Sequence, residues 1–371
     1  MTTWLLLSRL EHGGLERVQL NLAKTLHARG SDIRLVAGQV RVDMRHELPD
    51  TLQVVEIARS GRAAFLPGLV RALHRDRPDV VFTTSNDVAC LMLLLTMTIF
   101  RSTRVVVAQH LSLSGPRLGA RGFKRAKLEV VRRAMRLLVT KADHIVAVSQ
   151  AVARDMSREL SLPESAITVI HNPIVTADFT NRMLEAAQWP WPDRNDPTIV
   201  FVGRISAEKR LDLLLDSFQA LLGKISARLL IAGTGPLHGD IQRKVEESNM
   251  EHRCKLVGFV HDPLPLIHAS DVLVLPSDFE GFGNVLVEAM ACGTQVIATD
   301  CPDGPAEILE NGKYGQLVPV GDADALTAAI LRSLTQEGRV PAERLRARAS
   351  EFGLERSVDA YERIIYRDTP T

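Results

Sequence analysis

The chain has 371 residues, of which 46% are hydrophobic and 24% charged, a balance that excludes a disordered or fibrous protein. Its 45 basic and 44 acidic side chains leave a net charge of +1, so no nucleic-acid partner is expected. At ~150 residues per domain, the length suggests two domains.

No targeting or disulfide pattern stands out. The four cysteines form no C-x-x-C pair, so neither a zinc knuckle nor a thioredoxin-like motif is predicted. The first apolar run, residues 4–7, is too short for a signal-peptide core. The most apolar stretch, residues 88–100, is shorter than the ~20 apolar residues that a spanning helix needs. We therefore expect a cytoplasmic protein without a membrane-spanning helix.

Short apolar runs alternate with amphipathic segments in the first half of the chain. They predict buried strands at residues 4–7, 33–37, 80–83, 105–108, 145–148 and 167–170. Helices are predicted between most of them, among them 15–29, 66–75 and 126–141. This alternation is typical of a doubly wound parallel sheet covered on both faces.

A proline-rich break follows, and then the alternation restarts. Residues 176–197 are predicted to be a linker, because three prolines fall close together near its end. Further strands are predicted at 199–202, 229–232, 255–257, 272–275 and 295–298, with helices at 211–222, 237–248 and 285–291. A last amphipathic helix is predicted at 356–367. The fold class is therefore α/β, with two Rossmann-like domains (1–175 and 198–354) facing a central cleft, and a helical tail (355–371).

Ligands of such sheets bind outside the carboxyl ends of the strands, so the loops there are the candidate sites. Gly13-Gly14 follows the first strand and opens a helix, where backbone amides favour an anion. Gly203 and Arg204 follow the first strand of the second half, with Lys209 five residues after Arg204. These two cations would neutralise a diphosphate.

A Gly-x-Gly loop supplies carboxylates as well as amides. Gly281 and Gly283 open a helix after a predicted strand, which makes a phosphate cradle. Glu280 lies in that loop and Glu288 on the helix, where a carboxylate can accept two hydrogen bonds from a ribose diol. His110 ends a predicted strand, and its position there favours contact with a sugar.

These motifs, in this order, resemble the retaining glycosyltransferases of family 4. The order is Gly13-Gly14-x-Glu16, Gly203-Arg204-x₄-Lys209, Gly233-x-Gly235-Pro236, and Glu280-Gly281-Phe282-Gly283 with Glu288. The resemblance covers nearly the whole chain and implies the GT-B fold, with the C-terminal helix returning to the N-terminal domain. The sequence departs from the family at Leu15, where alanine usually follows the glycine pair.

The resemblance also implies roles. Arg204 and Lys209 would hold the donor's diphosphate, Glu288 the ribose, and Glu280 the hydroxyls of the transferred sugar. The residues assigned to catalysis are His110, Arg204, Lys209 and Glu280; those assigned to substrate binding are Gly13, Gly14, Gly203, Gly235, Gly258, Phe259, Val260, Gly281, Phe282, Gly283, Asn284, Val285 and Glu288. Transfer would proceed with retention and by front-face attack, with no metal or other cofactor.

The expected partners follow from a further resemblance and from charge. The segment from Asp300 to Leu309 resembles enzymes of bacterial exopolysaccharide, lipopolysaccharide and lipid-linked glycan assembly, which implies a UDP-hexose or UDP-N-acetylhexosamine donor and a glycan or lipid-linked acceptor. Between Arg117 and Lys141 nine basic residues accompany one acid, Glu129. We expect this segment to dock on an anionic membrane surface, although a solvated helix face is the alternative.

Two other activities are alternatives to this interpretation. A nucleotide-sugar 2-epimerase shares the GT-B fold, but we find no matching set of acid and base carboxylates. A nicotinamide-dependent oxidoreductase would rest on Gly233-x-Gly235, which lacks the correctly spaced third glycine and the acidic residue after the next strand.

Overall fold

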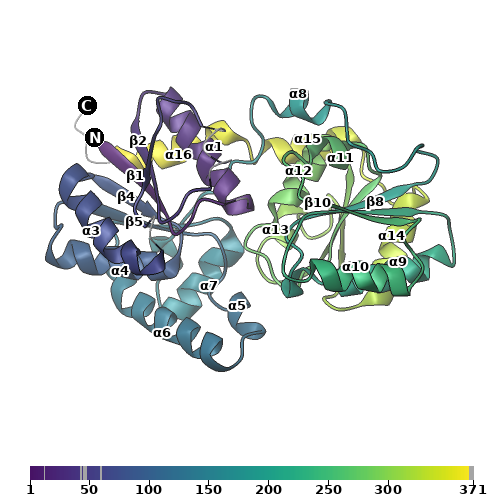
Figure 1. Ribbon diagram of the computed structural model, residues 1–371, viewed down its shortest axis with the longest axis horizontal. Coiled ribbons are helices and arrows are strands. Elements are labelled where there is room, and N and C mark those ends of the chain that lie inside the picture. The colour runs from purple at the N-terminus through teal and green to yellow at the C-terminus, as the bar shows by residue number, and fades with distance from the viewer. Residues whose placement is uncertain (12, 42–43, 45–47, 59–60, 367–371) are drawn as a thin grey trace. The chain divides into compact units, whose positions relative to one another are not determined.

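The computed structural model describes residues 1–11, 13–41, 44, 48–58 and 61–366. The chain folds into two compact units (Figure 1). Unit 1 consists of Met1–Pro173 and Leu354–Thr371, and unit 2 is the continuous stretch Ile174–Gly353. The chain therefore passes from one unit to the other twice.

Unit 1 contains a seven-stranded parallel sheet in the order β3-β2-β1-β4-β5-β6-β7. The strands are β1 (Thr2–Leu7), β2 (Asp32–Ala37), β3 (Gln53–Glu56), β4 (Val80–Thr83), β5 (Arg104–Gln109), β6 (His144–Ala147) and β7 (Thr168–Val169). The helices are α1 (Gly14–Ala28), α3 (Phe65–Asp76), α4 (Asn86–Thr98), α5 (Gly115–Leu118), α6 (Gly122–Leu138), α7 (Gln150–Leu160) and α16 (Leu354–Ile365).

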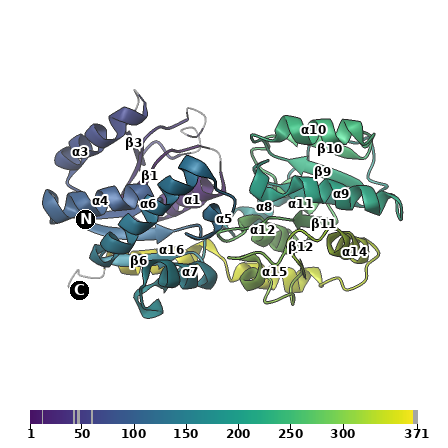
Figure 2. The ribbon, with the colours of Figure 1, turned by 90° about the horizontal axis from the view of Figure 1, so that it is seen from below.

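Alternate residues of the central strands form one core with α1 and α16. Leu5, Leu35 and Phe82 point to the same face of the sheet, because side chains alternate along a strand. Tyr361 of α16 is buried against them, with its ring 5.6 Å from that of Phe82. The predicted return of the C-terminal helix to the N-terminal domain is confirmed, and α16 lies beside α1 (Figure 2).

An arginine fixes the α1–α16 contact at its edge. Arg29, just after α1, pairs with three carboxylates of α16: Glu355, Asp359 (2.7 Å) and Glu362 (2.7 Å). These hydrogen bonds raise the pKa of Arg29 above its usual range, the bond to Asp359 contributing most. The last helix is thus held by both apolar packing and charge.

Unit 2 contains a six-stranded parallel sheet in the order β10-β9-β8-β11-β12-β13. The strands are β8 (Thr198–Val202), β9 (Arg228–Ala232), β10 (Cys254–Gly258), β11 (Val272–Leu275), β12 (Gln295–Thr299) and β13 (Gln316–Val318). The helices are α8 (Phe179–Met183), α9 (Leu211–Leu222), α10 (His238–Glu247), α11 (Leu264–His268), α12 (Asn284–Cys292), α13 (Pro305–Ile308), α14 (Ala323–Leu334) and α15 (Ala342–Ser350). Both units are Rossmann-like, as predicted.

Residues 176–197, which we expected to be a linker, contain α8 and belong to unit 2. Trp191 is buried there, and its indole N–H donates to the carbonyl of His252 (3.1 Å). The Arg228 guanidinium lies 5.2 Å from the centre of the Trp191 ring and pairs with Asp193 (2.8 Å). This segment is therefore packed against the rest of unit 2.

All four cysteines are free thiols, and burial raises the pKa of Cys254 and Cys301 to about 12. Such thiols are poor nucleophiles. Among the described residues, no helix combines the length and apolar character needed to cross a bilayer.

Candidate functional site

The candidate site of unit 2 lies where the strand order changes direction. From β8 the chain leads through α9 to β9 on one side, whereas β11 flanks β8 on the other. The loops that follow β8 and β11 therefore diverge from a shared edge, which is where ligands of open α/β sheets bind. These loops carry the predicted cations and carboxylates.

The glycine-rich loops after β8 and β9 pack backbone against backbone. Gly203 N–H donates to Ala232 O (3.0 Å), and Ile205 N–H donates to Thr234 O (2.9 Å). A Cβ atom on Gly235 would lie 2.2 Å from the carbonyl oxygen of Ile205. The need for glycine at position 235 is thus explained by packing, and its predicted contact with substrate stays a prediction.

Lys209 and Glu280 are brought together, as a cation and a carboxylate from different loops. The Lys209 ammonium donates to Glu280 Oε1, and the hydroxyl of Ser277 donates to the same oxygen (2.6 Å). The two charged side chains are only 19% and 10% exposed. Sequence reasoning missed Ser277, although its spacing of three residues from Glu280 in one loop was a usable signal.

A second ion pair joins the same two loops, between Arg210, next to Lys209, and Asp278, next to Ser277. Arg210 donates from Nη1 to Asp278 (3.0 Å), and Asp278 N–H donates to the carbonyl of Glu208 (2.8 Å). Arg210 adopts a left-handed backbone (φ 48°), which strains a non-glycine residue. Its bonds to Asp212 and Asp278 raise its pKa above the usual range.

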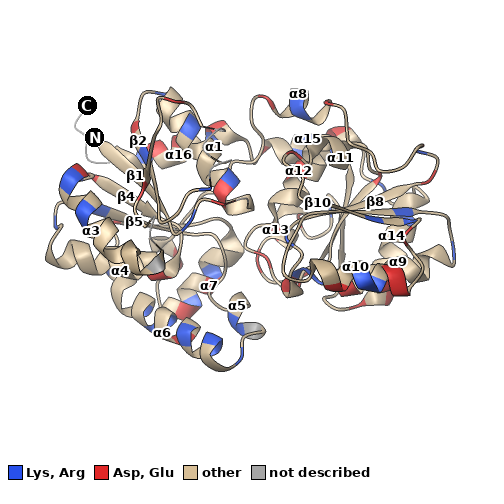
Figure 3. Ribbon diagram, in the orientation of Figure 1, with Lys and Arg blue, Asp and Glu red and all other residues tan. Residues whose placement is uncertain are grey.

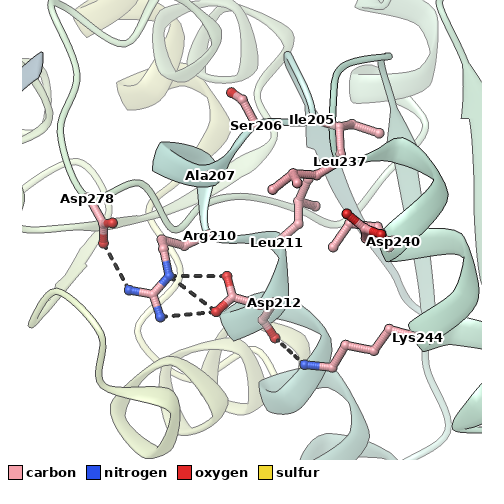
Figure 4. Close-up of a pocket in the computed structure, with 11 residues that line it drawn as sticks. Ile205, Ser206, Ala207, Arg210, Leu211, Asp212, Leu237, Asp240, Lys244 and Asp278 are labelled. Atoms are coloured by element: carbon pink, nitrogen blue, oxygen red, sulfur yellow. Dashed lines mark hydrogen bonds and ion pairs between the residues drawn. The ribbon is translucent and has the colours of Figure 1, made fainter. Parts of the chain in front are cut away.

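A pocket of about 470 Å³ lies beside this loop (Figure 4). Arg210 and Asp278 face each other on its wall, with Asp212 and Lys244 on the helices that follow. Because Arg204, Lys209 and Glu280 do not line it, the predicted diphosphate site is a different surface of the same loop.

The helix that carries Glu288 begins at the Gly-x-Gly loop. Gly283 precedes α12 with φ 96°, a conformation that favours glycine, and the first turn of α12 presents its backbone amides there. The loop after β12 packs closely against the Gly-x-Gly loop, since a Cβ on Gly304 would lie 2.0 Å from the carbonyl oxygen of Phe282. Glu288 is half-buried one turn further along α12.

Arg182 of α8 lies within electrostatic reach of Glu288. Burial lowers the pKa of Arg182, but its hydrogen bond to Asp262 (2.7 Å) and the charges of Asp178 and Glu288 outweigh burial and raise it. Sequence reasoning missed Arg182 because it lies in the segment expected to be a linker.

The other site residues predicted in unit 2 lie in the loop after β8 and at the end of β10. Arg204 is exposed, and the described part of the chain offers it no ion pair. Gly258 ends β10 with φ 73°, and its carbonyl accepts from Gly233 N–H (2.7 Å). Phe259 is 47% exposed and Val260 is half-buried.

Three predicted residues belong to unit 1. Gly13 caps α1 with an extended backbone, and Gly14 is the first residue of that helix. His110 follows β5, with Nε2 3.3 Å from the side-chain nitrogen of Gln19. Burial lowers the pKa of His110 to about 4 and outweighs the interaction with Asn172, which raises it, so the ring is neutral at pH 7.

A second pocket, of about 420 Å³, opens at the carboxyl ends of β1 and β2. It is lined by Arg9, Gly38, Phe65, Leu91 and Lys127, among others. Sequence reasoning did not identify it, because its lining comes from segments far apart in the chain.

The unit 2 loops carry two cations, two carboxylates and the start of a helix, and among the charged groups Lys209 and Glu280 are in direct contact. Cations and helix amides bind an anionic diphosphate, and carboxylates accept hydrogen bonds from sugar hydroxyls. The arrangement is suited to a nucleotide sugar.

Comparisons with known proteins point the same way. Residues 12–178 match the family model described as Glycosyltransferase Family 4, and residues 196–336 match Glycosyl transferases group 1. The chain is 29% identical over 190 residues to N-acetylgalactosamine-N,N'-diacetylbacillosaminyl-diphospho-undecaprenol 4-alpha-N-acetylgalactosaminyltransferase of Campylobacter jejuni, which covers 51% of this chain and 50% of that protein. It is 29% identical over 234 residues to the lipopolysaccharide 1,6-galactosyltransferase of Escherichia coli, covering 61% and 62%. The matches thus span between half and three-fifths of these relatives.

Solved structures show the fold. A glycosyltransferase of Rickettsia africae superposes with a TM-score of 0.78 at 19% identity, covering 99% of this chain and 98% of that one. The structure of HepE of Anabaena in complex with UDP and glucose superposes with a TM-score of 0.78 at 19% identity, covering 99% of this chain and 100% of that one. The chain therefore contains a Glycosyltransferase Family 4 domain over residues 12–178 and a Glycosyl transferases group 1 domain over residues 196–336, within a GT-B fold.

Proposed function

We propose that the chain is a retaining glycosyltransferase that moves a hexose or N-acetylhexosamine from a UDP-sugar to a glycan or lipid-linked glycan acceptor in cell-surface polysaccharide assembly. The observation that carries this proposal is the Lys209–Glu280 pair beside the start of α12. It puts a cation for the leaving diphosphate next to a carboxylate for the sugar. UDP in the HepE crystals and the lipid-linked substrate named for the Campylobacter relative support the choice of donor and acceptor.

In this proposal the diphosphate lies against Arg204, Lys209 and the first amides of α12. The bond from the anomeric carbon to the diphosphate oxygen breaks, and negative charge grows on that oxygen. Lys209 and the helix amides stabilise this charge, which is where fixed donors have the largest effect on rate. The acceptor hydroxyl attacks from the same face and gives its proton to the departing diphosphate oxygen.

The carboxylates serve the two ends of the donor. Ser277 and Lys209 orient Glu280 to accept hydrogen bonds from the transferred sugar, and Glu288 accepts from the ribose. Protein cations take the role that a divalent ion serves in other transferases, so we propose that turnover needs no metal.

A lipid-linked acceptor places the reaction at a membrane. We propose that the protein is peripheral on the inner face of the cell membrane, with the segment from Arg117 to Lys141 toward anionic lipid.

One experiment tests the activity. The protein is incubated with a panel of nucleotide sugars and a lipid-linked acceptor, with and without EDTA, and released nucleoside diphosphate and glycosylated lipid are measured. Release of UDP in both conditions, with an α-linked product from an α-linked donor, is the expected result. Strict dependence on Mg²⁺ or Mn²⁺ would refute the metal-free mechanism. A donor epimerised at C2 without UDP release would replace the proposal with an epimerase.

A further inference from the structure

Helix α6 exposes a line of large apolar side chains. Phe123, Val130 and Leu137 are 87%, 65% and 77% exposed, whereas Met135 on the opposite side is fully buried. At 3.6 residues per turn, positions seven apart lie nearly in line, so the three side chains form a ridge ~21 Å long. We call Phe123, Val130 and Leu137 the α6 ridge. The sequence alone did not identify the α6 ridge, because it does not report which face of the predicted helix is buried.

The basic residues of this region divide into two groups. Arg117, Arg132 and Arg133 pair with Glu129, at 3.3, 2.6 and 3.0 Å. Arg132 and, to a smaller extent, Arg133 lower the pKa of Glu129 to about 2. The other six are exposed and have no ion pair within the part of the chain that the structure describes: Arg121, Lys124, Arg125, Lys127, Arg136 and Lys141.

Among the unpaired cations within α6 (Lys124, Arg125, Lys127 and Arg136), Lys127 lies nearest to the α6 ridge. At 100° per residue, Lys127 lies about 60° to one side of the ridge and Arg136 about 120° to the other. Figure 3 shows basic residues along α6. The segment from Arg117 to Lys141 contains nine basic residues, although the net charge of the whole chain is only +1. The helix thus joins exposed apolar surface to uncompensated positive charge.

This combination selects one kind of partner. A second copy of the chain would cover the apolar ridge but would bring like charges together. A hydrated polyanion would satisfy the cations and leave the apolar side chains in water. An anionic bilayer meets both demands, because its headgroups pair with Lys and Arg and its acyl boundary takes up the ridge.

We propose that α6 lies in the plane of an anionic lipid surface with Phe123, Val130 and Leu137 inserted below the headgroups. This inference deepens the proposed function, on which it rests for the lipid-linked acceptor. It goes beyond electrostatic docking, since insertion of the ridge must survive salt that screens the cations.

The test is cosedimentation of the full chain with phosphatidylcholine vesicles containing either 40% or no phosphatidylglycerol, roughly at 0.1 M and 1 M NaCl. The ridge variant carries Phe123→Gln, Val130→Gln and Leu137→Gln. The charge variant carries Lys124→Gln, Lys127→Gln and Arg136→Gln. The control, Leu184→Gln with Val320→Gln, removes exposed apolar side chains from unit 2.

We expect the wild type and the control to bind the anionic vesicles and to keep part of that binding at high salt. The charge variant should lose roughly 100-fold in partitioning at low salt, at about fivefold per cation. The ridge variant should lose at least about tenfold and keep no binding at high salt. Wild-type binding by the ridge variant at high salt, or no binding by the wild type, would overturn the proposal.

A second measurement does not depend on the multiple variants. Tryptophan introduced by Phe123→Trp should be quenched by lipids brominated along the acyl chains, beyond any quenching of the wild type; equal quenching would overturn insertion. If the wild type were a dimer and the ridge variant a monomer, the α6 ridge would instead be an interface between two copies of the chain. UDP titration on the same proteins separates the two proposals, because vesicle binding without UDP binding refutes only the proposed function, and the converse only this inference.

Discussion

Replacing Lys209 with Met removes the cation that faces Glu280 while keeping most of the side-chain volume. Two separable effects are expected. The first is on stability: Glu280 loses a charged partner but keeps the hydroxyl of Ser277, so the free energy of unfolding should fall by about 1.5–3 kcal/mol, nearer the lower value.

The second effect is on turnover. A donor aimed at a developing anion is worth ~2–4 kcal/mol, so kcat/KM for the preferred nucleotide sugar should fall roughly 30- to 1,000-fold. Released UDP gives the rate, and urea unfolding gives the stability of the same preparation. The rate is read at a temperature where both proteins are fully folded, so that the two effects do not mix.

Lys313 offers a matched control in the same unit. It pairs with Glu310 at 2.7 Å but is 51% exposed, so Lys313→Met should change stability by less than about 1 kcal/mol and leave kcat/KM unchanged. A folded Lys209→Met protein that turns over within twofold of the wild type would refute the assignment of Lys209 to the leaving diphosphate.

Three further predictions concern single residues. Glu288→Ala should weaken UDP binding about tenfold in a calorimetric titration, and an unchanged affinity would remove its ribose role. Gly235→Ala should lower the free energy of unfolding by about 1–3 kcal/mol, because its Cβ would lie 2.2 Å from Ile205 O, whereas Gly239→Ala in α10, with open space around it, should be neutral or stabilising. Burial lowers the pKa of His110 from 6.5 to about 4, so the unfolded chain binds the proton first, and the stability that neutral His110 contributes above pH 6.5 is lost as the pH falls toward 4. Urea unfolding at pH 7 and pH 5 should therefore show a larger loss for the wild type than for His110→Gln; equal losses would contradict the buried, neutral ring.

The sequence predicted those features that local patterns determine. Val80–Thr83 and Val272–Leu275 were predicted with their observed bounds, because each is a short apolar run between polar ends. Helix 211–222 was likewise predicted with its observed bounds, which are those of α9. β3 was missed, since this edge strand is only four residues long and partly exposed.

The site was predictable only where one loop holds its parts. The Gly-x-Gly loop and the two cations were found from their positions after strands. The electrostatic attraction between Arg182 and Glu288, and the ion pair of Arg210 with Asp278, join segments far apart in the chain. Such pairs depend on how helices and loops pack in three dimensions, which periodicity and spacing do not report.

The position of α16 has a consequence for how the protein matures during synthesis. The sheet face that holds Leu5 and Phe82 is covered in part by Tyr361, which the ribosome makes only after the ~180 residues of unit 2. At 5–20 residues per second this face stays open for about 10–40 s. Unit 2 is continuous and can fold first, and Ile174 and Val175 donate to the carbonyl of Phe352, so the chain leaves unit 2 beside the point where it entered. The half of the protein that is made first is therefore completed last, and part of its apolar sheet face stays uncovered by α16 until the end of synthesis.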